Sequence, residues 1–179
     1  MTLFMHLRHL IPWLLIERNN KLLQDLARWK TIHKLTCADY TAMAILLWRF
    51  KEFRNLVLYR NRHHPIRRRL IGLFYPPMDT LYLDALEIGG GLYIQHGFAT
   101  MIAAKSVGEN CWINQQVTVG YNGQSDPPII GNNVQIACGA KILGNITVGD
   151  NSVIGANAVV IRDVEPNATM VGVPAKRIR

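Results

Sequence analysis

Residues 130–160 read IGNNVQIACGAKILGNITVGDNSVIGANAVV, and an aliphatic residue recurs at every sixth position of this stretch. The recurring residues are Ile130, Ile136, Ile142, Val148, Ile154 and Val160. A helix repeats its buried face about every 3.6 residues and a strand about every 2, so neither produces this spacing. The period predicts a solenoid of short strands, in which each aliphatic residue fills an equivalent interior corner of one coil.

The repeat extends toward the N-terminus with interruptions. Small residues such as Gly131 and Ala137 follow the aliphatic ones and would let neighbouring coils approach closely. One extra residue lies beside His96, and a longer break covers 121–128, where Asn-Gly and Pro-Pro dipeptides predict a loop. The earlier aliphatic positions are Ile88 and Ile94, then Met101, Val107, Ile113 and Val119. We therefore expect the solenoid to span about 80–165.

Charge divides the 179-residue chain into two parts, and its length suits one or two domains. Residues 1–76 hold 14 Lys/Arg and 4 Asp/Glu, whereas 77–179 hold 6 and 8. We predict an N-terminal helical segment over 1–76, followed by a β-helix domain with a C-terminal tail over 77–179. Helices are expected over 3–14, over 22–29, from a cap at Asp39 through 42–59, and from Pro65 to the residue before Pro76.

The basic cluster at 63–69 has three interpretations. It could be a solvated helix face near an oligomer contact, a surface for anionic lipid or an acidic glycan carrier, or a nucleic-acid site. No recognised nucleic-acid motif accompanies it, so we expect no nucleic acid as a partner. Three cysteines without a CxxC pair, and an apolar stretch at 10–16 too short to span a bilayer, predict a cytoplasmic protein. Contact with the inner face of the membrane stays open.

His96 is the only histidine in the predicted solenoid. A neutral imidazole can take a proton from a hydroxyl, although a lone histidine is more often structural. Its place beside an interruption of the repeat favours a functional role. Cys111 and Cys138 lie on different coils with no second histidine between them, so we expect no metal. A γ-type carbonic anhydrase needs three histidine ligands, and it is excluded because the predicted solenoid contains His96 alone.

Five segments carry a resemblance to a known family. They are 88–97 (IGGGLYIQHG), 116–120 (QVTVG), 139–146 (GAKILGNI), 171–176 (VGVPAK) and, in the helical part, 53–60 (FRNLVLYR). On these the chain resembles the hexapeptide-repeat acetyltransferases with a left-handed parallel β-helix. Within them it is similar to the serine acetyltransferase branch, and most to the colanic acid and capsular polysaccharide O-acetyltransferases.

The resemblance implies acetyl-CoA as co-substrate and His96 as the general base that deprotonates an acceptor hydroxyl. It also implies a homotrimer with acetyl-CoA in the groove between two solenoids; pairing of trimers through the helical segments stays open. The positions that match the groove are Tyr121, Asn122, Cys138 and Ala156, with Lys176 and Arg177 placed to meet CoA phosphates.

Three departures from serine acetyltransferases bear on the acceptor. Gln95 precedes the histidine where they carry Asp, and Ser125-Asp126-Pro127 stands where they carry Arg-His-Pro. The acid that would orient the histidine matches Leu81, so we expect Asp84 to serve instead, with Asp79 or a backbone carbonyl as alternatives. We expect Gln95 and Asp126 to contact the substrate.

The leading hypothesis is an O-acetyltransferase acting on a sugar of a surface polysaccharide or its lipid-linked precursor. Serine O-acetyltransferase is the alternative enzyme, and a non-catalytic solenoid scaffold is the alternative without catalysis.

Overall fold

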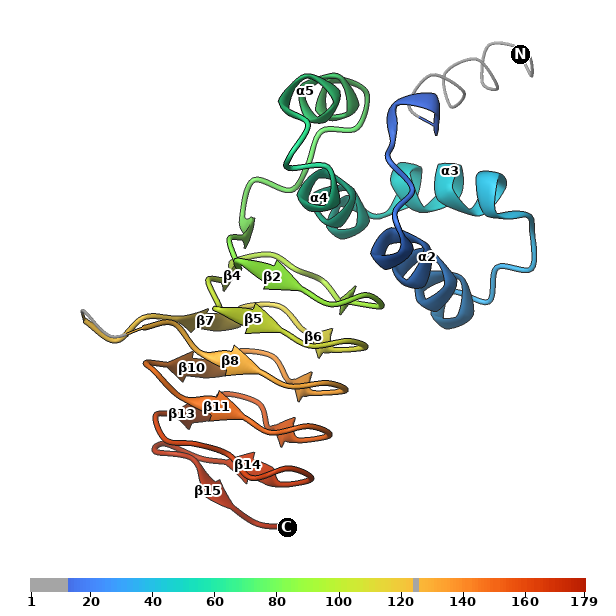
Figure 1. The fold of residues 1–179 in the computed structure, drawn as a ribbon. Helices are drawn as coiled ribbons and strands as arrows, with labels where there is room; N and C mark the ends of the chain where they lie inside the picture. Colours follow the sequence, from blue (N-terminus) through green and yellow to red (C-terminus); the bar gives the residue numbers. More distant parts are fainter. Residues whose placement is uncertain (1–12, 124–125) are drawn as a thin grey trace. The chain divides into compact units, whose positions relative to one another are not determined.

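The computed structural model describes residues 13–123 and 126–179. The chain separates into two compact units, Met1–Met78 and Asp79–Arg179. The first is helical and the second is built of short strands (Figure 1). Compactness alone does not test whether either part folds independently, so the predicted domains 1–76 and 77–179 stay a prediction.

The second unit is a parallel β-solenoid whose successive coils place their strands in three sheets (Figure 1). The first sheet contains β1 (Leu81–Leu83), β4 (Thr100–Ile102), β7 (Thr118–Gly120), β10 (Lys141–Leu143) and β13 (Val159–Val160). The second contains β2 (Glu87–Ile88), β5 (Ser106–Val107), β8 (Ile129–Ile130) and β11 (Thr147–Val148). The third contains β3 (Tyr93–Ile94), β6 (Trp112–Ile113), β9 (Gln135–Ile136), β12 (Val153–Ile154), β14 (Thr169–Val171) and β15 (Lys176–Arg177). The strands pair in parallel except β14 with β15, so the predicted fold class is confirmed.

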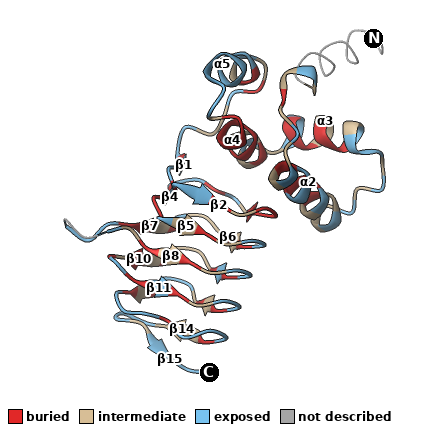
Figure 2. Ribbon diagram, in the orientation of Figure 1, coloured by how far each residue is buried: buried red, intermediate tan, exposed pale blue. Residues whose placement is uncertain are grey.

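The interior of the solenoid is filled by the aliphatic residues of the six-residue period. Ile130, Ile142 and Ile154 are almost completely buried and belong to three different sheets. Figure 2 shows buried segments along the strands of the solenoid. Each such side chain contributes about 1.5–3 kcal/mol through burial, so the repeat is also the core.

A column of glycines lets the coils stack at the corner after the second sheet. Gly89, Gly108, Gly131 and Gly149 each follow its inward aliphatic residue. A Cβ added at Gly108 would lie 2.5 Å from the carbonyl carbon of Gly131, and one at Gly89 would lie 2.7 Å from that of Gly108. These distances are shorter than real contacts, so a larger residue would force neighbouring coils apart.

The predicted phase is wrong at one coil. Met101 is 44% exposed, whereas its neighbour Ile102 is completely buried. Ile102 lies in register with Val119, and Met101 with Thr118. The inward position of β4 is therefore Ile102, which the strict six-residue count had missed by one residue.

The first unit contains α2 (Asn20–Ile32), α3 (Asp39–Arg49), α4 (Lys51–Arg60) and α5 (Pro65–Phe74). The side chain of Asn19 caps α2 by accepting a hydrogen bond from the N–H of Leu22 at 3.0 Å. Most of the predicted helix over 3–14 lies outside the described residues.

Two expectations for the helical unit are wrong. The helix predicted over 42–59 is interrupted at Phe50, whose φ of −119° and ψ of 110° are extended. Asp39 does not cap α3, because Ala38 occupies the cap position without a side-chain hydrogen bond. The Asp39 carboxylate instead accepts a hydrogen bond from Nζ of Lys30 at 2.6 Å.

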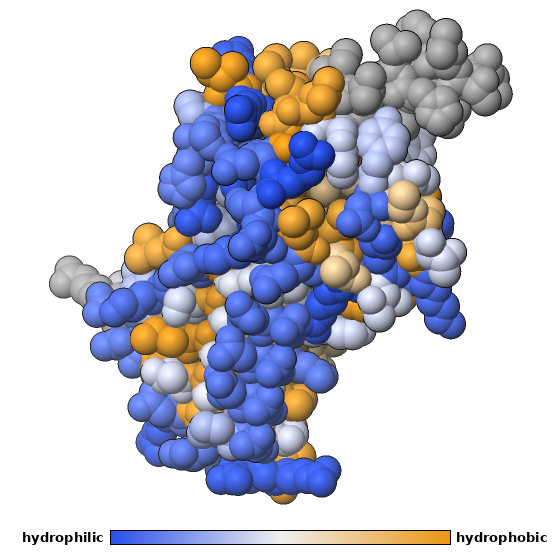
Figure 3. Space-filling model, turned by 45° about the vertical axis from the view of Figure 1, so that its right-hand side comes forward, coloured by the Kyte–Doolittle hydropathy of each residue, from blue (hydrophilic) through white to orange (hydrophobic). Residues whose placement is uncertain are grey.

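Helix α5 leaves an apolar face open. Ile71 is its buried residue, whereas Ile66 and Leu73 are 77% and 75% exposed and Leu70 is also exposed. Figure 3 shows apolar and hydrophilic side chains next to one another at the top of the helical unit, where Figure 1 labels α5. None of the helices that the structure describes is long and apolar enough to cross a membrane.

Candidate active site

His96 lies in an enlarged corner between β3 and β4. The register pairs Ile94 with Ile113 and Ile102 with Val119. Eight positions separate 94 from 102, but six separate 113 from 119, so two residues are inserted at the His96 corner. The expected insertion of one residue is therefore corrected to two, because the sequence count had taken Met101 as the inward residue.

The insertion changes the backbone and exposes the imidazole. His96 and Ala99 have φ values of 58° and 51°, whereas the next coil has one such residue at its corner, Gln116 at 60°. The carbonyl of His96 accepts a hydrogen bond from the N–H of Phe98, which turns the chain tightly. His96 is exposed, so its imidazole is accessible to a substrate.

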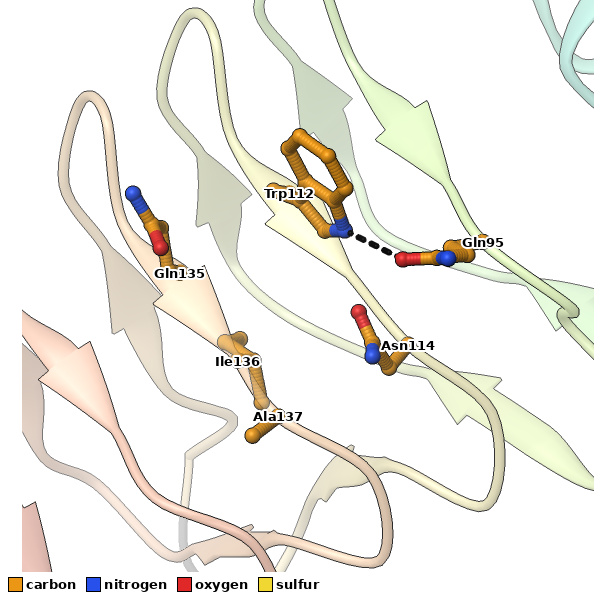
Figure 4. Close-up of a pocket in the computed structure, with 6 residues that line it drawn as sticks. All are labelled: Gln95, Trp112, Asn114, Gln135, Ile136 and Ala137. Carbon is orange, nitrogen blue, oxygen red and sulfur yellow. Dashed lines mark hydrogen bonds between the residues drawn. The ribbon is translucent and has the colours of Figure 1, made fainter.

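A hollow of about 270 Å³ lies on the outer face of the third sheet. One of its lining residues is Gln95, which directly precedes His96 in the sequence. Its walls come from three successive coils (Figure 4), and the lining residues are Gln95, Trp112, Asn114, Gln135, Ile136 and Ala137. The indole N–H of Trp112 donates a hydrogen bond to Oε1 of Gln95 at 3.2 Å. The ring of Trp112 packs edge-on against Tyr93, with centroids 4.8 Å apart.

Sequence reasoning missed Trp112, Asn114 and Gln135 as site residues. The repeat could have indicated Asn114, because it follows Ile113 as Gln95 follows Ile94, and Ile94 and Ile113 are register partners. Residues at equivalent positions of neighbouring coils lie side by side on the outer face as well as inside. The prediction applied this equivalence to the interior positions alone.

Asp84 is exposed at the corner after β1, and its N–H donates to the carbonyl of Ile102 at 2.9 Å. Within the described residues, no hydrogen bond or ion pair joins the carboxylate of Asp84 to His96. Leu81 is buried in the solenoid interior. A role for Asp84 in orienting the imidazole stays a prediction.

The expected acetyl-CoA positions fall in three places: the loop after β7, one corner of two successive coils, and β15. Tyr121 is exposed, and with Asn122 it begins the loop after β7. Cys138 and Ala156 occupy the same corner of successive coils, since the N–H of Asn157 donates to the carbonyl of Cys138 at 2.9 Å. Asp126, an expected substrate contact, is exposed in the loop next to residues outside the described part.

Basic groups lie on the same unit. Lys176 and Arg177 are exposed on β15, at the C-terminal coil. Sequence reasoning overlooked Lys141, whose Nζ donates to the carbonyls of Gln116 at 2.6 Å and Gly139 at 2.9 Å. Its ammonium group thus lies along the row of corners that contains Cys138. In the ranges that the structure describes, no group of three or more His, Cys, Asp or Glu could hold a metal ion.

Comparison with known proteins relates this architecture to one enzyme class. Residues 127–162 match the family model "Bacterial transferase hexapeptide (six repeats)". The chain is 43% identical over 164 residues to a serine acetyltransferase of Synechococcus elongatus, covering 85% of this chain and 66% of that protein. It is 38% identical over 128 residues to a serine acetyltransferase of Staphylococcus epidermidis, covering 68% and 59%. The chain thus spans less than two thirds of these curated relatives.

Solved structures agree with the sequence matches. Neisseria gonorrhoeae serine acetyltransferase, in complex with serine, superposes with a TM-score of 0.66 at 28% identity, covering 88% of this chain and 67% of that one. The serine acetyltransferase of Brucella abortus gives a TM-score of 0.67 at 26% identity, covering 88% and 66%.

These relatives contradict the leading hypothesis of a polysaccharide O-acetyltransferase, and nothing in them supports closeness to the colanic acid and capsular enzymes. The hypothesis took the loss of charged groups at Gln95 and around Asp126 as evidence for a sugar over serine, which it kept as the alternative acceptor. Those positions are two departures in a chain that is otherwise 43% identical over 164 residues to a serine acetyltransferase. The chain is therefore similar to the hexapeptide-repeat transferases, and the relatives and solved structures that it matches are serine acetyltransferases.

Proposed function

We propose that this protein is an acetyl-CoA-dependent serine O-acetyltransferase. The observation that carries the proposal is the exposed His96, set in an enlarged corner beside a hollow, in a chain 43% identical to a serine acetyltransferase. General-base chemistry needs an accessible imidazole next to a space that can hold the acceptor. The exposure of His96 and the hollow lined by the preceding residue, Gln95, support this proposal.

In the proposed reaction, the imidazole of His96 takes the proton of the serine hydroxyl. The serine oxygen attacks the thioester carbonyl of acetyl-CoA, and the tetrahedral intermediate then expels the CoA thiolate. The protonated imidazole returns its proton to that sulfur, leaving O-acetylserine and CoA. Asp84 is proposed to hold the imidazole.

Acetyl-CoA is proposed to lie along the row of corners from Cys138 to Ala156, with Tyr121 and Asn122 at its edge. Lys176 and Arg177 are exposed on β15 and are proposed to bind its phosphates, since cations form strong hydrogen bonds with phosphate oxygens. A homotrimer would complete this groove. We further propose that the protein acts in the cytoplasm; contact with the inner membrane face through α5 stays a prediction.

The test follows release of CoA from acetyl-CoA and L-serine by the purified protein. His96→Ala should lower turnover about 10²–10⁴-fold, the usual contribution of a general base. His63→Ala, which changes an exposed histidine of the helical unit, should leave turnover unchanged. Equal turnover in the His96→Ala variant and the unmodified protein would refute the mechanism.

A second measurement addresses the scaffold alternative. Calorimetric titration should detect CoA binding to the unmodified protein and to His96→Ala alike, because the base does not hold the cofactor. Ala156→Trp should weaken that binding by filling the groove at an exposed position. Absence of CoA binding and of turnover would favour the scaffold. Light scattering would test the trimer.

A further inference from the structure

The amide of Gln95 has a defined orientation. Indole nitrogen is a hydrogen-bond donor only, so the group that faces Nε1 of Trp112 at 3.2 Å is the carbonyl oxygen of Gln95. Figure 4 shows the amide nitrogen on the side of Gln95 away from Trp112. Within the described residues, this nitrogen donates to no protein group. Gln95 therefore presents a hydrogen-bond donor beside the hollow.

Trp112 is itself held in place. Tyr93 and Trp112 are register partners on β3 and β6, and their rings form a T-shaped pair. Tyr93 is buried, so the indole rests against a ring that cannot swing into solvent. Rotation of the Gln95 amide would break its hydrogen bond to an indole that has little freedom to follow.

The lining of the hollow is neutral. None of the six lining residues is charged, and the side-chain amides of Asn114 and Gln135 make no hydrogen bond to a described residue, although their backbone groups do. A carboxylate can accept hydrogen bonds from amide nitrogens, whereas an ammonium group needs acceptors and is favoured by negative charge. A fixed N–H at Gln95 thus suits a carboxylate and offers nothing to an ammonium.

We propose that Gln95, oriented by Trp112, binds the carboxylate of the acceptor, so that the enzyme recognises a 3-hydroxycarboxylate without pairing its ammonium group at this position. The inference rests on the proposed serine acetyltransferase function and specifies how that site selects its substrate. Trp112 acts here as a positioning residue and Gln95 as the binding residue.

Three acceptor substrates distinguish the contribution of serine's carboxylate from that of its ammonium group. L-Serine has both charged groups, 3-hydroxypropanoate has the carboxylate alone, and ethanolamine has the ammonium alone. With the unmodified protein, acetylation should be measurable for serine and 3-hydroxypropanoate, and kcat/KM for ethanolamine should be lower than for either. Higher kcat/KM for ethanolamine than for 3-hydroxypropanoate would overturn the proposal.

Gln95→Glu is the decisive variant, because it keeps the shape and the acceptor for the Trp112 N–H but replaces the outward donor with a negative oxygen. It should raise KM for serine and 3-hydroxypropanoate at least about tenfold and lower KM for ethanolamine, since like charges repel and opposite charges attract. KM for acetyl-CoA should not change. Gln116→Glu adds the same charge at an exposed corner outside the hollow. This control should leave KM for serine, 3-hydroxypropanoate and ethanolamine unchanged.

Trp112→Phe removes the indole donor but keeps an aromatic ring against Tyr93. Loss of one hydrogen bond predicts a KM for serine about 2–10-fold higher, with kcat nearly unchanged. A fall in kcat without a rise in KM would argue for a merely structural role and against positioning.

A binding measurement separates this inference from the proposed function. Saturation-transfer NMR can follow 3-hydroxypropanoate on the protein without acetyl-CoA. Binding that Gln95→Glu abolishes, in a protein that acetylates nothing, would support the inference while the proposed function fails. Serine turnover and binding that Gln95→Glu leaves unchanged would overturn the inference and leave the function intact.

Discussion

Arg60 and Asp25 form a two-point ion pair in the interior of the helical unit. Nε of Arg60 donates to Oδ2 of Asp25 at 2.8 Å, and Nη2 donates to Oδ1 at 3.1 Å. The residues are 35 positions apart on α4 and α2, and Asp25 is completely buried. The pair therefore links two helices at a place where water cannot replace either partner.

Asp25→Ala should destabilise the protein by about 3–5 kcal/mol, because it leaves the guanidinium of Arg60 buried without its counter-charge. Asp39→Ala removes a carboxylate that pairs with Lys30 at the surface and should cost about 1 kcal/mol or less. Urea unfolding of both variants measures the difference. Equal losses would mean that the buried pair contributes no more than an exposed one.

His33 predicts a loss of stability in mild acid. Burial lowers its pKa from the ordinary value of 6.5, and the positive charge of Arg49 lowers it further, while Glu52 opposes the shift. The folded state then holds its proton less tightly than the unfolded state. The resulting penalty is absent well above pH 6.5 and grows as the pH falls from there toward the folded pKa.

The free energy of unfolding, measured in urea between about pH 5 and 8, should therefore fall toward the acid end. His33→Phe keeps a ring beside Trp29 and Phe50, which His33 contacts at centroid distances of 5.6 and 4.1 Å. This variant should show a smaller acid loss than the unmodified protein. The same pH slope in both proteins would rule out His33 as its source.

Gly108→Ala should destabilise the solenoid, because its new Cβ would lie 2.5 Å from the backbone of Gly131. Overpacking against backbone costs about 1–3 kcal/mol. Gly120→Ala is the matched control, since a Cβ there meets nothing within 4 Å. Thermal unfolding should show a lower Tm for Gly108→Ala than for Gly120→Ala, and a reversed order would contradict the close stacking of coils.

The open face of α5 predicts binding to anionic membranes. Ile66, Leu70 and Leu73 recur at helical spacing and are exposed, with Arg67 and Arg69 beside them. Apolar residues flanked by basic ones suit an interfacial helix. Glu17 lies 3.9 Å from Arg67 and offsets part of this charge. Because salt screens the attraction between exposed charges, the binding should weaken as the salt concentration rises.

Cosedimentation with phosphatidylserine vesicles measures this binding. The double variant Ile66→Ser, Leu73→Ser should lose most of it. Leu86→Ser with Val173→Ser changes two similarly exposed residues of the solenoid and should retain it. Equal recovery of both variants with the vesicles would dismiss α5 as the contact.

Much of the solenoid was predictable because its period is local. The six aliphatic residues that recur from Ile130 to Val160 are buried as expected, and the loop after Val119 lies where the Asn-Gly and Pro-Pro dipeptides predict it. The helix break at Phe50 was not predictable from periodicity, since residues on both sides continue an apolar pattern. Sequence reasoning identified His96 as a candidate base but misjudged the acceptor, because it weighed a few differing positions above the overall relationship.

The sequence by itself determined the coil, through the recurrence of one aliphatic residue for each interior corner. Only the tertiary structure decided the insertion of two residues at His96 and the hydrogen bond between Trp112 and Gln95. The reason is physical: a period describes neighbours along one chain segment, whereas a site in a solenoid forms across coils. Residues 17 positions apart become adjacent only when strand register brings their coils together.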